Sequence, residues 1–307
     1  MAAHVLRTRP SVLSCDVIAG AVVEVADLAA TRAFYEPIFR DAPGQWEQRA
    51  DRLVFRCGPQ RIELVQRAAP VTLTDSAQHQ AYNVAPGRVV ALVQELEAAG
   101  HEVHRWHEDH PAEREDNAYF YDPSGNRVQL VASDDSGLVL DHFVYEVHDL
   151  EPEDVYYVSV LGGSIDYYHG RSMYDYEQGT AWGEGRDPTA APWTRFWPGP
   201  HSIAEATRQK GKVSHPAMQV FVRFGPTRLG LILGTVHRQE PPEEQVAGTP
   251  RVVLRARHTV GEAVEALRNP RVPLDPEGRM RLPFEEHGSS LLLRDPTGHF
   301  VELGCEG

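Results

Sequence analysis

One phrase occurs twice in this chain, and its repetition restricts the architecture more than any bulk property does. Residues 120–132 read FYDPSGNRVQLVA, and residues 292–305 read LLRDPTGHFVELGC. Each copy has an apolar run, Asp-Pro, a small residue, Gly and a second apolar run. The copies differ at one informative position, which is Gln129 in the first and Glu302 in the second. Such recurrence indicates that one structural unit has been used more than once.

Two further pairs of segments repeat ahead of this phrase. Residues 19–39 and 141–161 each show a β-like alternation that ends in Glu-Val-X-Asp-Leu, followed by apolar residues at helical spacing. Residues 52–66 and 220–234 each read as a strand, a Gly-Pro turn and a second strand. These segments recur in the same order along the chain, which disfavours chance similarity.

A third pair completes the pattern. Residues 79–100 and 251–269 each predict a strand and an amphipathic helix, and each leads into one copy of the Asp-Pro phrase. Asp27, Asp149 and Thr259 are expected to cap three of the helices. We therefore predict an α+β chain of four βαβββ modules. Their approximate limits are residues 16–70, 76–133, 139–238 and 248–307.

Composition limits the partners of such a chain. Acidic residues outnumber Lys and Arg by 44 to 30, which gives a formal charge of -14. This charge disfavours nucleic acid and anionic membranes, because both bind clustered Lys and Arg. The three cysteines are far apart, which disfavours disulfides and a thiolate zinc site and fits a reducing cytoplasm. No apolar run approaches the ~20 residues that cross a bilayer, so we expect a cytoplasmic protein.

The modules resemble those of a known superfamily. The first strands of modules one and three end in Val-X-Asp-Leu, and the last strand of the chain reads Asp-Pro-X-Gly-X-X-X-Glu-Leu. These features resemble the vicinal oxygen chelate (VOC) superfamily, which includes glyoxalase I, fosfomycin- and bleomycin-resistance proteins and type I extradiol dioxygenases. The resemblance implies that the modules pair into two cupped, barrel-like VOC domains. It also implies metal ligands at the start of a module's first strand and in the middle of its last strand, where side chains converge on one concave surface.

Carried over residue by residue, the resemblance gives five candidate metal ligands. They are His79 and His142 on first strands, and Glu63, Gln129 and Glu302 on last strands. The matching positions Gly20 and Gly230 offer no side chain. Imidazole and carboxylate donors suit a divalent metal with positions left open for substrate. Fe(II) is favoured, with Mn, Zn or Ni as alternatives.

Two pairings of the modules are open. In the sequential pairing, modules one and two form a domain at residues 1–135, and modules three and four form a domain at residues 136–307. The second domain carries an insertion rich in Tyr, Trp, Gly and Pro at about residues 165–215. The short linker SDDSGL between modules two and three resembles the sequential arrangement of the extradiol dioxygenases. In the exchanged pairing, modules two and three share one cup, and modules one and four share the other.

The pairing decides which candidate ligands meet. Sequential pairing groups Glu63 and His79 with Gln129, and it groups His142 with Glu302. Exchanged pairing groups His79 and His142 with Gln129, which is close to a two-histidine, one-carboxylate triad. It leaves Glu63 with Glu302. A carboxylate that points inward needs a partner or a metal to offset its burial.

The resemblance to extradiol dioxygenases also implies a His and a Tyr near the last strand. In module two these positions are His110 and Tyr119, which could donate to a substrate oxygen or act in proton transfer. We expect a metal-dependent, dioxygenase-like oxidoreductase that acts on an aromatic or vicinal-oxygen small molecule, with homo-oligomerisation left open. One alternative is a glyoxalase-like isomerase or lyase, in which Glu63 or another carboxylate would move the proton. Another is a metal-free, drug-binding protein of the bleomycin-resistance type.

Overall fold

The computed structural model describes residues 11–72, 78–103, 117–134, 137–147, 153, 155–169, 219–233, 250–269 and 282–306. By its contacts the chain forms two compact units. One unit comprises residues 19–143 and 247–253, and the other comprises residues 1–18, 144–246 and 254–307. Within the described stretches, no helix is long and apolar enough to cross a bilayer.

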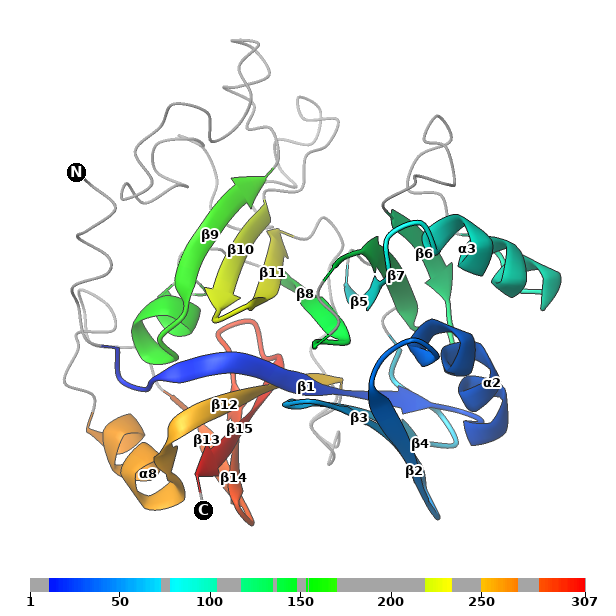
Figure 1. Ribbon diagram of the computed structural model, residues 1–307. Coiled ribbons are helices and arrows are strands. Elements are labelled where there is room, and N and C mark those ends of the chain that lie inside the picture. The colour runs from blue at the N-terminus through cyan, green and yellow to red at the C-terminus, as the bar shows by residue number, and fades with distance from the viewer. Residues whose placement is uncertain are drawn as a thin grey trace, which may run out of the picture. The chain divides into compact units, whose positions relative to one another are not determined.

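The first module follows the predicted order (Figure 1). It contains β1 (Cys15–Val25), α2 (Leu28–Phe39), β2 (Gly44–Arg49), β3 (Arg52–Cys57) and β4 (Gln60–Gln66). Asp27 caps α2 as predicted. Its Oδ1 atom accepts hydrogen bonds from the backbone N–H groups of Ala29 and Ala30, at 2.7 and 2.9 Å.

The other modules follow this order, although the described part of module two has only two strands after its helix, and the predicted cap Asp149 of module three lies outside the described residues. The second contains β5 (His79–Val84), α3 (Val89–Ala98), β6 (Asn117–Tyr121) and β7 (Arg127–Ala132). The third contains β8 (Leu140–Val147), a π-helical turn (Val155–Val160), β9 (Ser164–His169), β10 (Gln219–Phe224) and β11 (Thr227–Leu233). The fourth contains β12 (Arg251–Thr259), α8 (Val260–Arg268), β13 (Phe284–His287), β14 (Ser290–Arg294) and β15 (Phe300–Glu306).

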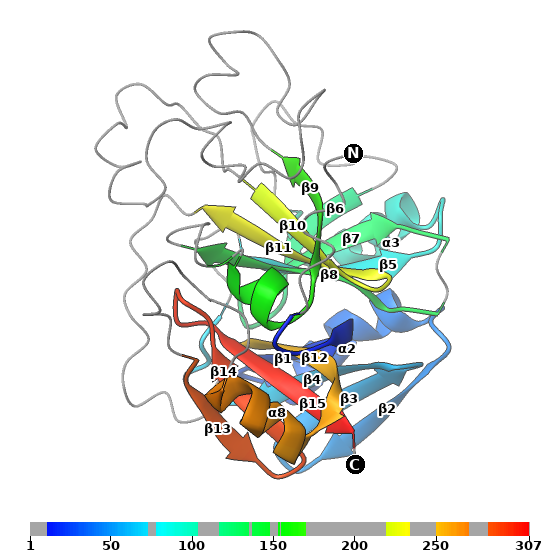
Figure 2. The same ribbon diagram turned by 90° about the vertical axis from the view of Figure 1, so that its left-hand side faces the viewer.

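Local chemistry in the fourth module agrees with the sequence pattern. Thr259 caps α8 as predicted, and Glu262 completes a capping box by accepting a hydrogen bond from the Thr259 backbone N–H at 2.9 Å. The helix α8 packs on β15 (Figure 2). In the third module, the predicted insertion at residues 165–215 lies outside the described residues, apart from residues 165–169 in β9.

The strands form two open, cupped sheets, so the chain is α+β as predicted. The eight-stranded sheet has the order β13-β14-β15-β12-β1-β4-β3-β2, and the seven-stranded sheet has the order β6-β7-β5-β8-β11-β10-β9. At the level of strand order, modules one and four therefore share a sheet, and so do modules two and three, which is the exchanged pairing. The domain limits 1–135 and 136–307 stay a prediction, because β1, β8 and β12 each contribute residues to both compact units.

Aromatic packing joins the first two modules within one compact unit. The ring of Phe39 in α2 stacks on Phe55 of β3, with centroids 4.6 Å apart. On the same helix, Tyr35 meets Tyr82 of β5 edge to face, with centroids 5.9 Å apart. All four side chains are buried. The helix therefore fills the space between its own module and the next one, where aromatic pairs stabilise beyond the area they bury.

The first Asp-Pro phrase forms a turn that fastens module two to module one. Asp122 is buried, and its Oδ1 atom accepts hydrogen bonds from the backbone N–H groups of Ser124 and Asn126, at 2.8 and 2.9 Å. Its Oδ2 atom accepts one from the Tyr35 hydroxyl of α2, at 3.2 Å. The Asn126 side chain in turn donates to the carbonyl oxygen of Glu24 in β1, at 2.8 Å.

The second Asp-Pro phrase makes the same connections between modules three and four. Asp295 is buried and accepts hydrogen bonds from the His299 backbone N–H at 2.7 Å and from the Tyr157 hydroxyl at 2.9 Å. The His299 ring contacts the carbonyl oxygen of Glu146 through Nε2, at 2.6 Å. The repeated phrase thus has a structural role, because its carboxylate ties each even-numbered module to the helix of the preceding module.

Removing the Asp122 carboxylate should destabilise the fold. Asp122→Ala deletes the acceptor for four hydrogen bonds and leaves buried donors unpaired, so we expect the free energy of unfolding to fall by about 3 kcal/mol or more. Asp122→Asn keeps one acceptor oxygen and should cost about half as much. Urea unfolding followed by circular dichroism measures both. Equal stability of Asp122→Ala and the unaltered protein would contradict the role given to this turn.

The matching turn in module four contacts a second buried acid, Glu153 of module three. Burial raises the pKa of Asp295 from 3.8 to about 6, and burial together with the charge of Asp295 raises the pKa of Glu153 well above its usual range. Glu153 also accepts a hydrogen bond from the Thr297 backbone N–H, at 2.7 Å. The folded protein therefore holds protons at these acids that the unfolded chain releases above about pH 4.

Stability should accordingly depend on pH in a definite direction. Both pKa values are raised on folding, so the free energy of unfolding should fall as the pH rises from about 4 to about 6. Glu153→Gln keeps an acceptor for Thr297 and removes one acid, so this variant should show a flatter profile, by about 1 to 3 kcal/mol over that window. Urea midpoints measured at a series of pH values test this, and parallel profiles of the two proteins would contradict it.

Candidate functional site

Two predicted ligands meet on neighbouring strands. His79 begins β5, His142 lies near the start of β8, and these strands are adjacent in the seven-stranded sheet. The Nε2 atoms of the two rings lie 3.1 Å apart, and the rings are nearly perpendicular, with an interplanar angle of 81°. Both side chains are buried, with exposed fractions of 4% and 8%. Two imidazole nitrogens held this close either share a proton or face a common cation.

The ring of His142 has a second polar contact. Its Nδ1 atom lies 2.6 Å from Oδ2 of Asp141, whose carboxylate is about a quarter exposed at 23%. The opposite nitrogen of the same ring is the one that faces His79. Asp141 was not among the predicted site residues, although it directly precedes His142 in the sequence.

Gln129 lies on the same face of the sheet as His79. It pairs with Ala81 of β5, which is parallel to β7, and side chains alternate along a strand, so Ala81 and His79 point to one side. Gln129 is 8% exposed, and its Oε1 atom is buried without a hydrogen-bond partner among the described residues. An unpaired buried oxygen is unusual in a folded protein.

Tyr119 is an aromatic neighbour of His79. It lies on β6 opposite Gln129, and its ring centroid is 5.6 Å from that of His79. The guanidinium of Arg127 lies over the Tyr119 ring, 4.7 Å from the centroid. Arg127 is buried, and this burial lowers its pKa. No sequence pattern singled out Arg127, and the predicted His110 lies outside the described residues.

The seven-stranded sheet thus gathers three of the five predicted ligands, His79, His142 and Gln129. Elsewhere, Glu63 lies on β4 and Glu302 on β15, both in the eight-stranded sheet. Glu302 is buried and pairs across from Leu292 of β14. Within the described part of the chain, no group of three His, Cys, Asp or Glu side chains could hold a metal by itself. A metal on the histidine pair would therefore need the Gln129 amide, water or substrate as further donors.

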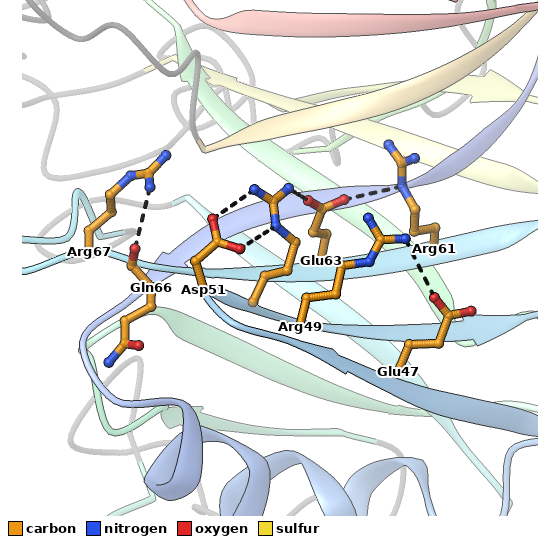
Figure 3. Close-up of polar contacts among 8 residues, drawn as sticks. Glu47, Arg49, Asp51, Arg61, Glu63, Gln66 and Arg67 are labelled. Carbon is orange, nitrogen blue, oxygen red and sulfur yellow. Dashed lines mark hydrogen bonds and ion pairs between the residues drawn. The ribbon is translucent and has the colours of Figure 1, made fainter.

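Glu63 is surrounded by arginines (Figure 3). Its carboxylate forms an ion pair and hydrogen bond with Arg52, and its other oxygen lies 3.5 Å from Nε of Arg61. Arg52 also binds Asp51 through two hydrogen bonds of 2.9 and 3.0 Å. The guanidinium groups compensate the charge of the buried carboxylate, so its burial alone does not require a metal.

The neighbouring strand explains why the first-strand position of module one carries no ligand. Gly20 of β1 pairs with Arg61 of β4 and has a φ of +148°. A Cβ atom at Gly20 would lie 1.8 Å from the carbonyl oxygen of Arg61. The backbones are therefore too close for any side chain at this position.

The surroundings of Glu63 make a prediction for Glu63→Gln. Loss of the charge leaves Arg52 and Arg61 undercompensated, and we expect the free energy of unfolding to fall by about 1 to 2 kcal/mol without loss of bound metal. The matched control is Glu47→Gln on the same hairpin, because Glu47 forms an exposed 2.7 Å ion pair with Arg56. The control should change stability by less than about 0.5 kcal/mol. Loss of metal from Glu63→Gln, measured by elemental analysis, would instead identify Glu63 as a ligand.

Comparisons with known proteins agree with this architecture. Residues 17–130 match the model of the Glyoxalase/Bleomycin resistance protein/Dioxygenase superfamily. Glyoxalase I from Zea mays is 16% identical, with a TM-score of 0.55 over 93% of this chain and 91% of that one. A putative dioxygenase from Bacillus subtilis is 11% identical, with a TM-score of 0.55 over 95% and 86% of the two chains. No curated protein matches the sequence. At these identities the likeness to both structures shows the fold.

Proposed function

We propose that this protein, a member of the glyoxalase/bleomycin resistance protein/dioxygenase superfamily, is an enzyme with a divalent metal held by His79, His142 and Gln129. One observation carries the proposal, which is the 3.1 Å approach of the two Nε2 atoms. The buried, unpaired Oε1 atom of Gln129 on the same sheet face supports it. Both features are explained together if a cation accepts lone pairs from all three side chains.

The donor set narrows the choice of metal. Two imidazoles with one oxygen donor suit Fe(II), Mn, Zn or Ni better than Mg or Ca, which prefer oxygen ligands throughout. A set of three protein donors leaves positions for substrate, as in catalytic rather than structural sites. Fe(II) is the metal that best fits the reaction proposed below.

The reaction we propose is ring cleavage of an aromatic vicinal diol by O₂. When bound, the metal would supply a site at which two adjacent substrate oxygens are chelated and O₂ is activated. Both oxygen atoms of O₂ enter the ring-opened product, so no external reductant is consumed. Tyr119, whose ring lies beside that of His79, would donate a hydrogen bond to a substrate oxygen.

A glyoxalase-like isomerase is the second candidate, because the likeness to glyoxalase I from Zea mays is as great as that to the Bacillus subtilis protein. That reaction needs a carboxylate to move a proton next to the metal. The carboxylate considered for this role, Glu63, lies on a strand of the other sheet and is held by Arg52 and Arg61. Glu63 is therefore poorly suited to be the base at the histidine pair, and the one carboxylate described beside that pair, Asp141, is bonded to the His142 ring.

Metal analysis of histidine variants tests the proposed site. Protein purified without oxygen and loaded with Fe(II) should bind about one equivalent of the metal. His79→Ala and His142→Ala should each lose most of it, because the two protein donors that remain hold the ion less tightly. Gln129→Ala should bind about tenfold more weakly. His287→Ala is the control, since His287 is exposed on β13. Undiminished metal in both site variants would refute the proposal and favour a metal-free binding protein.

Activity then separates the two reactions. The Fe(II)-loaded protein should consume O₂ and form a coloured ring-opened product when a panel of substituted catechols is supplied. Tyr119→Phe should lower turnover by about 10²- to 10⁴-fold if the phenol takes part in proton transfer. Isomerisation of an α-oxoaldehyde–thiol adduct, with no O₂ uptake from any catechol, would establish the glyoxalase-like reaction instead.

A further inference from the structure

We propose that Asp141 is a positioning residue for the metal site, which it serves by fixing the proton of His142 on Nδ1. The inference rests on the proposed function of the histidine pair. It concerns a side chain that would not touch the metal, but would decide which nitrogen of its neighbour is free to bind one.

The contact between the two side chains carries the inference. Oδ2 of Asp141 lies 2.6 Å from Nδ1 of His142, the short distance that is typical of a charge-assisted hydrogen bond. A carboxylate can only accept, so the proton of this bond belongs to Nδ1 of the imidazole. The lone pair of the neutral ring is then on Nε2, and that atom faces His79 at 3.1 Å.

This tautomer is the one that a shared cation requires. If His142 carried its proton on Nε2, that proton would point at the ring of His79 and block the approach of a metal. With the His142 proton held on Nδ1, its Nε2 atom can bind the metal. His79 must also carry its proton on Nδ1 for its own Nε2 atom to bind. Carboxylate–histidine–metal arrangements orient the ring and raise the basicity of the ligand in this way.

Charge gives Asp141 a second role at the same site. Two neutral imidazoles and an amide bring no negative charge to a divalent cation. Arg127, on the same strand as Gln129, brings a buried positive charge to the surroundings of Tyr119. The Asp141 carboxylate is about a quarter exposed and touches the His142 ring, so it supplies negative charge one side chain away from the metal.

The prediction concerns Asp141→Ala and Asp141→Asn in the full chain. Without the carboxylate, His142 loses its preference for Nδ1–H, so Asp141→Ala should bind Zn²⁺ and Co²⁺ about 10- to 100-fold more weakly in chelator competition. An asparagine oxygen still accepts from Nδ1 but carries no charge, so Asp141→Asn should retain the tautomer and lose less affinity. Asp51→Asn is the control, because Asp51 is an exposed acid that pairs with Arg52 in the other sheet.

A direct reading of the tautomer keeps the test independent of activity. Long-range ¹H–¹⁵N correlation spectra of the metal-free protein should show His142, assigned by its loss in His142→Ala, with the proton on Nδ1. In Asp141→Ala the same ring should shift towards the Nε2–H form. An Nε2–H tautomer in the unaltered protein, or metal affinity of Asp141→Ala within twofold of it, would overturn the inference.

The two proposals fail in different ways. If His79→Ala and His142→Ala keep their metal, the site itself is wrong, and the role of Asp141 falls with it. If those variants lose the metal while Asp141→Ala keeps both its affinity and the His142 tautomer, the site stands and only the inference about Asp141 is overturned.

Discussion

The adjacency of β5 and β8 is the constraint on which the candidate site depends. These strands bring His79 and His142 together although 63 positions separate them in the sequence. Strand alternation then directs Gln129 and Tyr119 to the same face, since both lie in register with residues on that side. A slip of one residue in either strand would turn its histidine to the opposite face. The register of this sheet therefore determines which side chains meet at the candidate site.

The repeated Asp-Pro phrase has a constant part, its aspartate, and a variable part, the position of Gln129 and Glu302. Its aspartate is constant in both copies, and in each it accepts a tyrosine hydroxyl from the preceding module. Its variable position, Gln129 or Glu302, lies further along on a strand and is free to differ because the turn does not use it. The two copies thus share the aspartate that holds modules together and differ at the position where the superfamily resemblance implies a metal ligand.

Sequence alone identified much of this arrangement and left specific parts open. The repeats predicted four modules and the helix caps at Asp27 and Thr259, and the superfamily resemblance named His79, His142 and Gln129 as candidate ligands. They could not choose the pairing of modules, because strand neighbours in a sheet are set by contacts distant in sequence. Nor could they say what offsets the burial of Glu63, since Arg52 contacts it only through the pairing of β3 with β4. Asp141 went unnoticed because adjacent residues of a strand are expected to point apart.

Gly20 has a consequence for how this cup could change in evolution. A side chain there would collide with the Arg61 backbone, and the positive φ disfavours every residue with a Cβ atom. No single codon change at this position can therefore introduce a coordinating group, because β4 would first have to move away from β1. A single substitution can change a side chain at the histidine pair, but it cannot add a coordinating side chain at Gly20.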